Sequence, residues 1–61
     1  MSVSIAQLSS LRSSLDELAK RVETAASDAQ ASGAEVMAAD LYEIERALAT
    51  AQRRFDRLLR P

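Results

Sequence analysis

The stretch Ala31-Ser32-Gly33-Ala34-Glu35 contains the only glycine of a 61-residue chain. The apolar residues on its two sides are mirror images about Gly33, because the numbers of each pair add to twice 33. A chain that folds back at Gly33 therefore brings each apolar residue of the first half opposite one of the second half. The pairs are Leu8 with Leu58, Leu11 with Phe55, Leu15 with Ala51, Leu18 with Leu48, Val22 with Ile44, Ala25 with Leu41, and Ala29 with Met37.

The spacing of these residues indicates helices. Before the glycine they are separated alternately by three and four positions, the heptad pattern of a helix seam. Continuing this heptad through the second half would put Glu43, Thr50 and Arg57 on the buried stripe, so one uninterrupted helix would bury the wrong face. A bend at Gly33, which suits the positive φ of a helix C-terminus, resets the phase. The pattern predicts an all-α antiparallel two-helix hairpin of the coiled-coil type.

Capping residues predict where the helices begin and end. Ser4 with Gln7 fits a capping box at the start of the first helix, and Ser32 with Glu35 fits a second box at the start of the second helix. We expect the first helix over residues 4–31, the turn at 32–33 and the second helix over 34–59. Sixty-one residues allow one domain, which we expect to cover residues 1–61.

Composition excludes several classes of chemistry. The chain has neither cysteine nor histidine, and so it lacks disulfides, thiolate metal ligands and the commonest general base. We predict no enzyme, no catalytic residue, no cofactor and no metal site. The acidic residues Asp40, Glu43 and Glu45 lack the histidine partners of bundle metal centres and are interpreted as a solvated face. The formal net charge of −1 provides no overall attraction to nucleic acid or anionic membranes.

Neither a membrane span nor a leader sequence is predicted. The longest apolar run, Val36-Met37-Ala38-Ala39, is far shorter than the ~20 residues of a spanning helix. The first residues lack the basic and apolar regions of a signal peptide. We therefore expect a cytoplasmic protein without membrane contact.

Small size predicts a partner, because a domain of this length buries only roughly 60% of its unfolded surface. One edge of the predicted stripe is the more apolar, and we expect it to contact a second copy, which gives a homodimeric four-helix bundle. Docking on a larger helical protein as an accessory subunit is the alternative. The predicted dimer or partner interface is Ile5, Leu8, Leu11, Arg12, Leu15, Ala19, Ala26, Ala38, Glu45, Gln52, Phe55 and Leu59.

Two further features bear on partners. No basic residue lies between Glu23 and Glu45, whereas arginines gather near the open end, which favours a two-fold dimer with its turns at opposite poles. Tyr42 and Val36 lie off the predicted stripe, either as anchors for a partner or as ordinary surface.

The arginine-rich segment near the C-terminus supports two interpretations. Arg53, Arg54, Arg57 and Arg60 are candidate contacts to nucleic acid, which makes a small nucleic-acid-binding regulator the runner-up function. The simpler interpretation is a solvated helix C-terminus whose arginines interact favourably with the negative end of the helix dipole. The preferred prediction is a non-enzymatic protein–protein interaction, scaffold or regulatory module that acts through helix–helix packing.

In length and topology, the expected hairpin resembles the Rop-type plasmid copy-number regulators, short helical hairpins that dimerise into bundles and bind RNA loops. No motif supports the resemblance, so it carries over no RNA-contacting residue. Secreted helical hairpins of the WXG type are longer and have a tryptophan at the turn, which this chain lacks.

Overall fold

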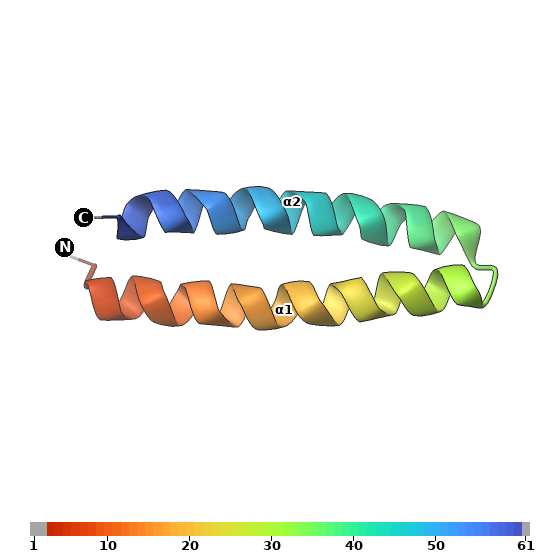
Figure 1. The fold of residues 1–61 in the computed structure, drawn as a ribbon, viewed down its shortest axis with the longest axis horizontal. Helices are drawn as coiled ribbons and strands as arrows, with labels where there is room; N and C mark the ends of the chain where they lie inside the picture. The colour runs from red at the N-terminus through yellow and green to blue at the C-terminus, as the bar shows by residue number, and fades with distance from the viewer. Residues whose placement is uncertain (1–2, 61) are drawn as a thin grey trace.

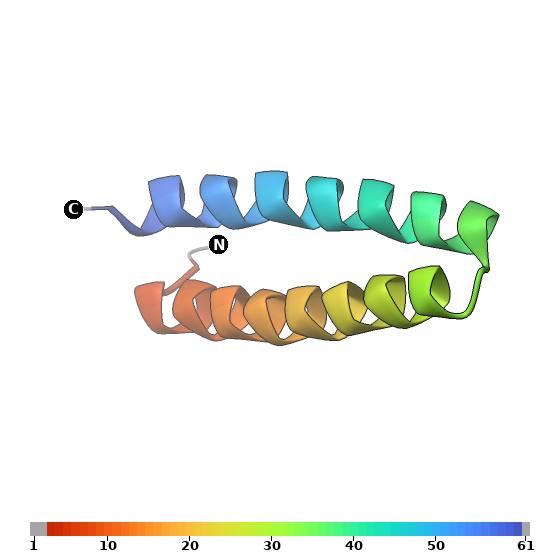
Figure 2. The same cartoon turned by 45° about the vertical axis from the view of Figure 1, so that its right-hand side comes forward.

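The computed structural model describes residues 3–60 and contains two α-helices, α1 (Ile5–Ala31) and α2 (Glu35–Leu59), with no β-strand in that range. The helices lie side by side and antiparallel, with the turn at one end and both termini at the other (Figure 1). They remain side by side when the molecule is turned by 45° (Figure 2). The molecule measures 46 × 20 × 15 Å. The prediction of an all-α helical hairpin is confirmed.

Ser4 caps the N-terminus of α1, as the sequence predicts. Its side-chain Oγ accepts a hydrogen bond from the backbone N–H of Gln7 at 3.0 Å, and its own backbone is extended. The bond satisfies one of the backbone donors that the first helical turn leaves without a partner. α1 therefore begins at Ile5, one residue after the expected boundary.

The turn between the helices is a Schellman motif around Gly33. The Ala34 N–H donates to the Ala29 carbonyl at 2.9 Å, and the Gly33 N–H donates to the Gln30 carbonyl at 3.1 Å, the two bonds that define this motif. Gly33 has a φ of +81°, in the left-handed region that glycine adopts without steric cost. The only glycine of the chain thus reverses its direction.

The predicted capping box of Ser32 and Glu35 is wrong. Ser32 is the C-terminal cap of α1, and its Oγ donates to the Ala29 carbonyl at 3.1 Å. Ala34 occupies the N-cap of α2 without a side-chain hydrogen bond. Because the tight turn uses Ser32 to end α1, α2 begins at Glu35, whose carboxylate lies where the helix dipole favours negative charge.

The stripe along which the helices pack differs from the predicted one at every second position. The predicted members that are exposed are Leu11, Leu18, Ala25, Met37, Ile44 and Leu58. The members of the buried stripe instead follow one another at intervals of alternately four and three residues, and all are partly or fully buried. They are Leu8, Arg12, Leu15, Ala19, Val22, Ala26 and Ala29 on α1, Ala34 at the N-cap of α2, and Ala38, Leu41, Glu45, Leu48, Gln52, Phe55 and Leu59 on α2. Each helix is therefore rotated about its axis relative to the prediction.

Alanines account for this rotation. Ala26, Ala29 and Ala38 are the most buried residues of the described chain, at 0%, 6% and 4% exposure, and all three lie toward the turn. Small side chains let the helix backbones approach closely, and close packing strengthens the many weak contacts between them. Each helix therefore presents its alanine side to the other, while Leu15 and Leu48 are partly buried nearer the middle of the hairpin.

The core formed in this way is small. Among residues 3–60, no large side chain is fully buried, because two helices cover only one side of each other. A compact monomer of 6.6 kDa exposes about 3,900 Å², whereas this hairpin exposes 4865 Å². The hairpin thus leaves about 1,000 Å² more surface in contact with solvent than a globular protein of its mass.

Candidate interaction surface

Half-exposed aliphatic side chains line one face of the hairpin. Each follows a residue of the buried stripe by three positions, as Leu11 follows Leu8 and Leu18 follows Leu15. Three positions correspond to about 60° of rotation to one side of the buried stripe. Because the helices are antiparallel and this offset has the same sense in both, the side chains share one face. We define the apolar face as Leu11, Leu18, Met37, Ile44 and Leu58, which are 44–61% exposed.

Two alanines complete the apolar face. Ala25 continues the α1 row after Leu18 at the same interval of seven, and Ala51 lies midway between Ile44 and Leu58 on α2. The row on α2 therefore runs nearly the full length of its helix, and the row on α1 covers the middle of its helix, from Leu11 to Ala25; no member of either row is charged. Several exposed aliphatic side chains on one face are a feature of protein–protein contact sites.

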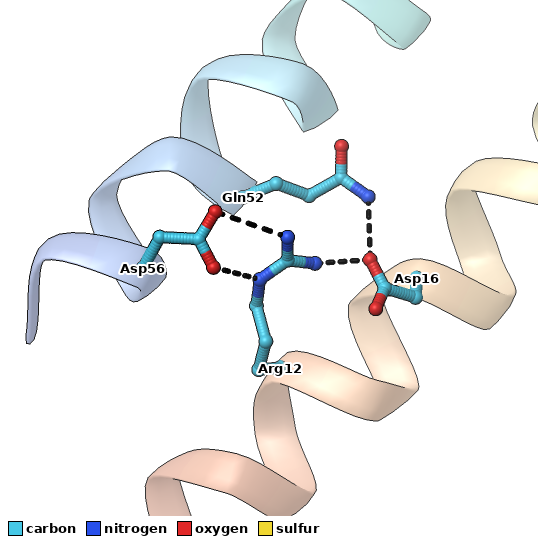
Figure 3. Close-up of polar contacts among 4 residues, drawn as sticks. All are labelled: Arg12, Asp16, Gln52 and Asp56. Carbon is cyan, nitrogen blue, oxygen red and sulfur yellow. Dashed lines mark hydrogen bonds and ion pairs between the residues drawn. The ribbon is translucent and has the colours of Figure 1, made fainter. Parts of the chain in front are cut away.

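The opposite face of the hairpin is polar, and its side chains bind one another. Arg12 Nε donates to Asp56 Oδ1 at 2.9 Å, and the second terminal guanidinium nitrogen donates to Asp56 Oδ2 at 3.2 Å. Arg12 also bonds Asp16, whose Oδ1 accepts from Gln52 Nε2 at 2.8 Å. Figure 3 shows these four side chains linking α1 to α2. We call this cluster the polar clasp.

The charges of the polar clasp shift two pKa values. The hydrogen bonds from Arg12 lower the pKa of the Asp56 carboxyl below its ordinary value. The same bonds raise the pKa of Arg12. Both shifts follow because each charged form is stabilised by a paired group of opposite charge. The bidentate geometry also fixes the two helices in one register, which a single ion pair would not do.

A second contact links the helices on the polar face near the turn. The Tyr42 hydroxyl donates to Gln30 Oε1. Gln30 follows Ala26 of the buried stripe by four positions, and Tyr42 follows Ala38 by four. Asp56 likewise follows Gln52 by four, so these contacts lie on the opposite side of the stripe from the apolar face. Tyr42 is therefore engaged within the chain, whereas Val36 is 80% exposed.

The residues predicted as a partner interface lie mostly between the two helices of the hairpin itself. Among them, Ile5 and Leu11 are exposed, and the others are partly or fully buried. The residues that sequence reasoning did not assign to the surface are Leu18, Met37, Ile44 and Leu58. Their heptad interval was a visible signal, but the same interval equally fitted the buried stripe.

The arginines at the open end lie on the surface of α2 and its C-terminal cap. Arg53, Arg54, Arg57 and Arg60 are exposed, and Arg53 donates to Thr50 Oγ1 at 3.2 Å. Phe55 is partly buried between the helices, which removes the aromatic side chain that could stack on a base among them. The prediction of nucleic-acid contact stays a prediction.

The interpretation of Glu45 as part of a solvated face is wrong, because Glu45 is partly buried in the stripe between the helices. Its Oε1 is inaccessible to solvent and has no hydrogen-bond partner within the described chain. A buried oxygen without a partner costs roughly 1–3 kcal/mol. The nearby Arg46 pairs instead with the exposed Glu43, at 3.5 Å between Arg46 Nη1 and Glu43 Oε1. Glu45 therefore weakens the seam at this level.

The remaining surface offers little chemistry. A shallow depression on α1 is lined by Glu17, Lys20, Arg21 and Thr24. Within residues 3–60, no group of three or more acidic side chains is placed to hold a metal ion. Neither of the described helices has the length and apolar character needed to cross a bilayer.

Comparison with protein-family models, with curated proteins and with solved structures finds no match to this chain.

Proposed function

We propose that this chain is a non-enzymatic interaction module of the cytoplasm, a scaffold or regulatory component that acts through helix–helix packing. Its apolar face binds the same face of a second copy, and the two hairpins form a four-helix bundle. The buried stripe holds the two helices of one chain together, and the apolar face holds the two chains together.

The observation that carries this proposal is the aliphatic surface of Leu11, Leu18, Met37, Ile44 and Leu58, all at least 44% exposed in a chain with a very small core. The excess exposed surface of about 1,000 Å² is similar to the ~800 Å² that each partner buries in a typical stable complex. A second hairpin would therefore cover about as much surface as this chain exposes in excess.

A second copy fits this face better than a single partner helix does. The apolar face spans both helices, because it includes Leu11 and Leu18 on α1 and Ile44 and Leu58 on α2. One added helix would lie in the groove between the two rows, whereas a second hairpin places one helix over each row. The dimer also places hydrophobic contacts on both sides of each helix, which the isolated hairpin lacks.

Sedimentation equilibrium combined with circular dichroism tests this proposal on the purified chain. We expect a helical species of twice the chain mass, with a melting temperature that rises with protein concentration, because mass action stabilises a dimer. A well-folded monomer at every concentration would overturn the proposal. A largely unfolded monomer would overturn it as well, and would assign the apolar face to a larger helical protein.

A further inference from the structure

Formal charge is divided between the two ends of the hairpin. The turn-side half, residues 23–45, contains six acidic residues and no basic residue. The open-end half contains all eight basic residues and three acidic ones. The turn and the termini lie at opposite ends of the molecule (Figure 1), so each hairpin is a rod with a negative turn and a positive open end.

Side-chain size is also distributed unevenly along the apolar face. On α1 the row consists of Leu11, Leu18 and Ala25. Turning the helix end for end about Leu18 therefore exchanges the large side chain of Leu11 with the small one of Ala25. On α2 the same reversal, about the point midway between Ile44 and Ala51, exchanges these two residues.

The two reversal points lie at nearly the same level of the hairpin. The bond between Asp16 and Gln52 fixes the register of α1 against α2. Leu18 lies two residues beyond Asp16, and the midpoint on α2 lies four to five residues before Gln52. The levels agree to within one helical turn, so one two-fold axis, perpendicular to the helices, serves both rows.

We propose that the second copy packs on the apolar face antiparallel to the first, with the two-fold axis at Leu18 and the turns at opposite poles. Leu11 then lies over the partner's Ala25, and Ile44 lies over the partner's Ala51. The acidic turn of each copy lies beside the arginine-rich open end of the other. This orientation rests on the proposed function, because it requires the dimer to form.

The alternative dimer, with both turns at one pole, conflicts with the charges. It would bring the two acidic halves together, each with six carboxylates and no cation. It would likewise gather the arginines of both copies at the other pole. Like charges brought together oppose association and suppress wrong arrangements, so charge selects the antiparallel orientation while the aliphatic side chains hold the dimer together.

Distances between labels on the two copies test the orientation, and the absence of native cysteine makes single labelling clean. Ala31 is exposed beside the turn, and the variant Ala31→Cys carries a nitroxide label there. Since Ala31 lies thirteen residues from Leu18, we expect a label-to-label distance of about 40 Å in the antiparallel dimer. A distance below about 20 Å, the separation expected of neighbouring helices plus two label arms, would overturn the orientation.

A mixed dimer provides the reciprocal measurement. Ser10 is exposed near the open end of α1. Reversal about Leu18 brings it level with the partner's Ala26, about 8 Å along the helix from the partner's Ala31, whereas turns at one pole would separate the two levels by about 32 Å. A donor on Ala31→Cys and an acceptor on Ser10→Cys in different copies should therefore show efficient energy transfer. Inefficient transfer in a mixed dimer confirmed by sedimentation would contradict the proposal.

The dependence of self-association on ionic strength is an independent test of the orientation. Raising ionic strength from about 0.05 M to about 0.5 M screens exposed charges, and we expect several-fold weaker self-association because attraction between opposite ends is lost. Self-association that strengthens with salt would indicate like ends together and overturn the orientation alone. A chain that stays monomeric in sedimentation equilibrium would overturn the proposed function itself, so the two failures are distinguishable.

Discussion

The polar and the apolar face flank the same buried stripe, and their side chains are used in opposite ways. On the polar face, Asp16 and Asp56 accept hydrogen bonds from Arg12 and Gln52 of the stripe (Figure 3). On the apolar face, Leu18 and its neighbours are about half exposed. The polar face is therefore complete within one chain, whereas the apolar face has contacts left to make.

This difference shows how a short chain can divide one apolar surface between two tasks. Each helix carries apolar residues at two positions of every heptad, and a third position holds alanine or a larger apolar residue except at Arg12, Glu45 and Gln52. This stripe is wider than two helices can bury. The hairpin buries the position lined by alanines and directs the position lined by Leu11, Leu18 and Ile44 outward. The hydrogen bonds of the polar clasp specify the register of α1 against α2, and the apolar face remains available for contact with a second copy.

The largest expected effect comes from placing a charge on the apolar face. Leu18→Asp puts two carboxylates together at the proposed two-fold axis, and breaking a buried contact with an unpaired charge costs about 3–5 kcal/mol. We expect self-association to weaken at least about a hundredfold, measured by sedimentation equilibrium.

Ser13→Asp is the matched control for this variant. Ser13 is exposed on α1, five positions from Leu18 and therefore on the outward side of the same helix. Like Leu18→Asp, the control variant introduces an aspartate into α1, with the same helix propensity. We expect its self-association to stay near that of the parent chain. Equal weakening by both variants would remove the apolar face from the interface.

The next effect separates the buried stripe from the apolar face within one helix. Leu48 is partly buried and Ile44, one turn before it, is 46% exposed. We expect Leu48→Ala to cost about 2–4 kcal/mol at every protein concentration, because it removes contacts inside the hairpin. Ile44→Ala should cost less than about 1 kcal/mol in dilute monomer and more where the dimer forms. Thermal melts across a dilution series measure both, and identical concentration dependence would contradict the division.

Local signals explain how much of this architecture could be predicted from sequence. Ser4 marks the start of α1, and Gly33 with the phase break marks the turn, because caps and glycine stops act over a few residues. The rotation of the helices was not predictable from periodicity, since leucines and alanines flank the stripe equally. The sequence did contain one signal for it. The residue numbers of Arg12 and Asp56 have the same sum as those of Asp16 and Gln52, so in an antiparallel hairpin the members of each pair lie at the same level along the helices.

A change at the turn alters the hairpin without touching either face. Gly33→Ala must hold a left-handed φ, which costs a residue with a Cβ about 1–2 kcal/mol. The added methyl group meets no atom within 4 Å, and so the cost comes from the backbone alone. Gly33→Asn should cost less, because asparagine tolerates this conformation. Chemical denaturation of the two variants measures the difference, and an unchanged stability of Gly33→Ala would refute the Schellman turn.

The smallest expected effect tests the polar clasp through pH. The hydrogen bonds from Arg12 lower the pKa of Asp56 below its ordinary value of 3.8, so the folded state binds this proton more weakly than the unfolded state does. The contribution of the pair is therefore fully present above the unfolded pKa and is lost as pH falls through the lower folded pKa. Asp56→Asn should melt slightly below the parent chain at neutral pH, and this difference should vanish in acid.

The control for this prediction is Arg12→Gln, which removes the donor and keeps the carboxyl. In this variant the pKa of Asp56, followed by NMR titration of its carboxyl carbon, should rise toward its ordinary value. The loss of stability caused by Ile44→Ala should not change with pH when the association state is held constant, because nonpolar contacts neither bind nor release a proton. An Asp56 pKa that is the same with and without Arg12 would show that the clasp does not form in solution, and would leave the alanines of the buried stripe as the main determinant of the helix register.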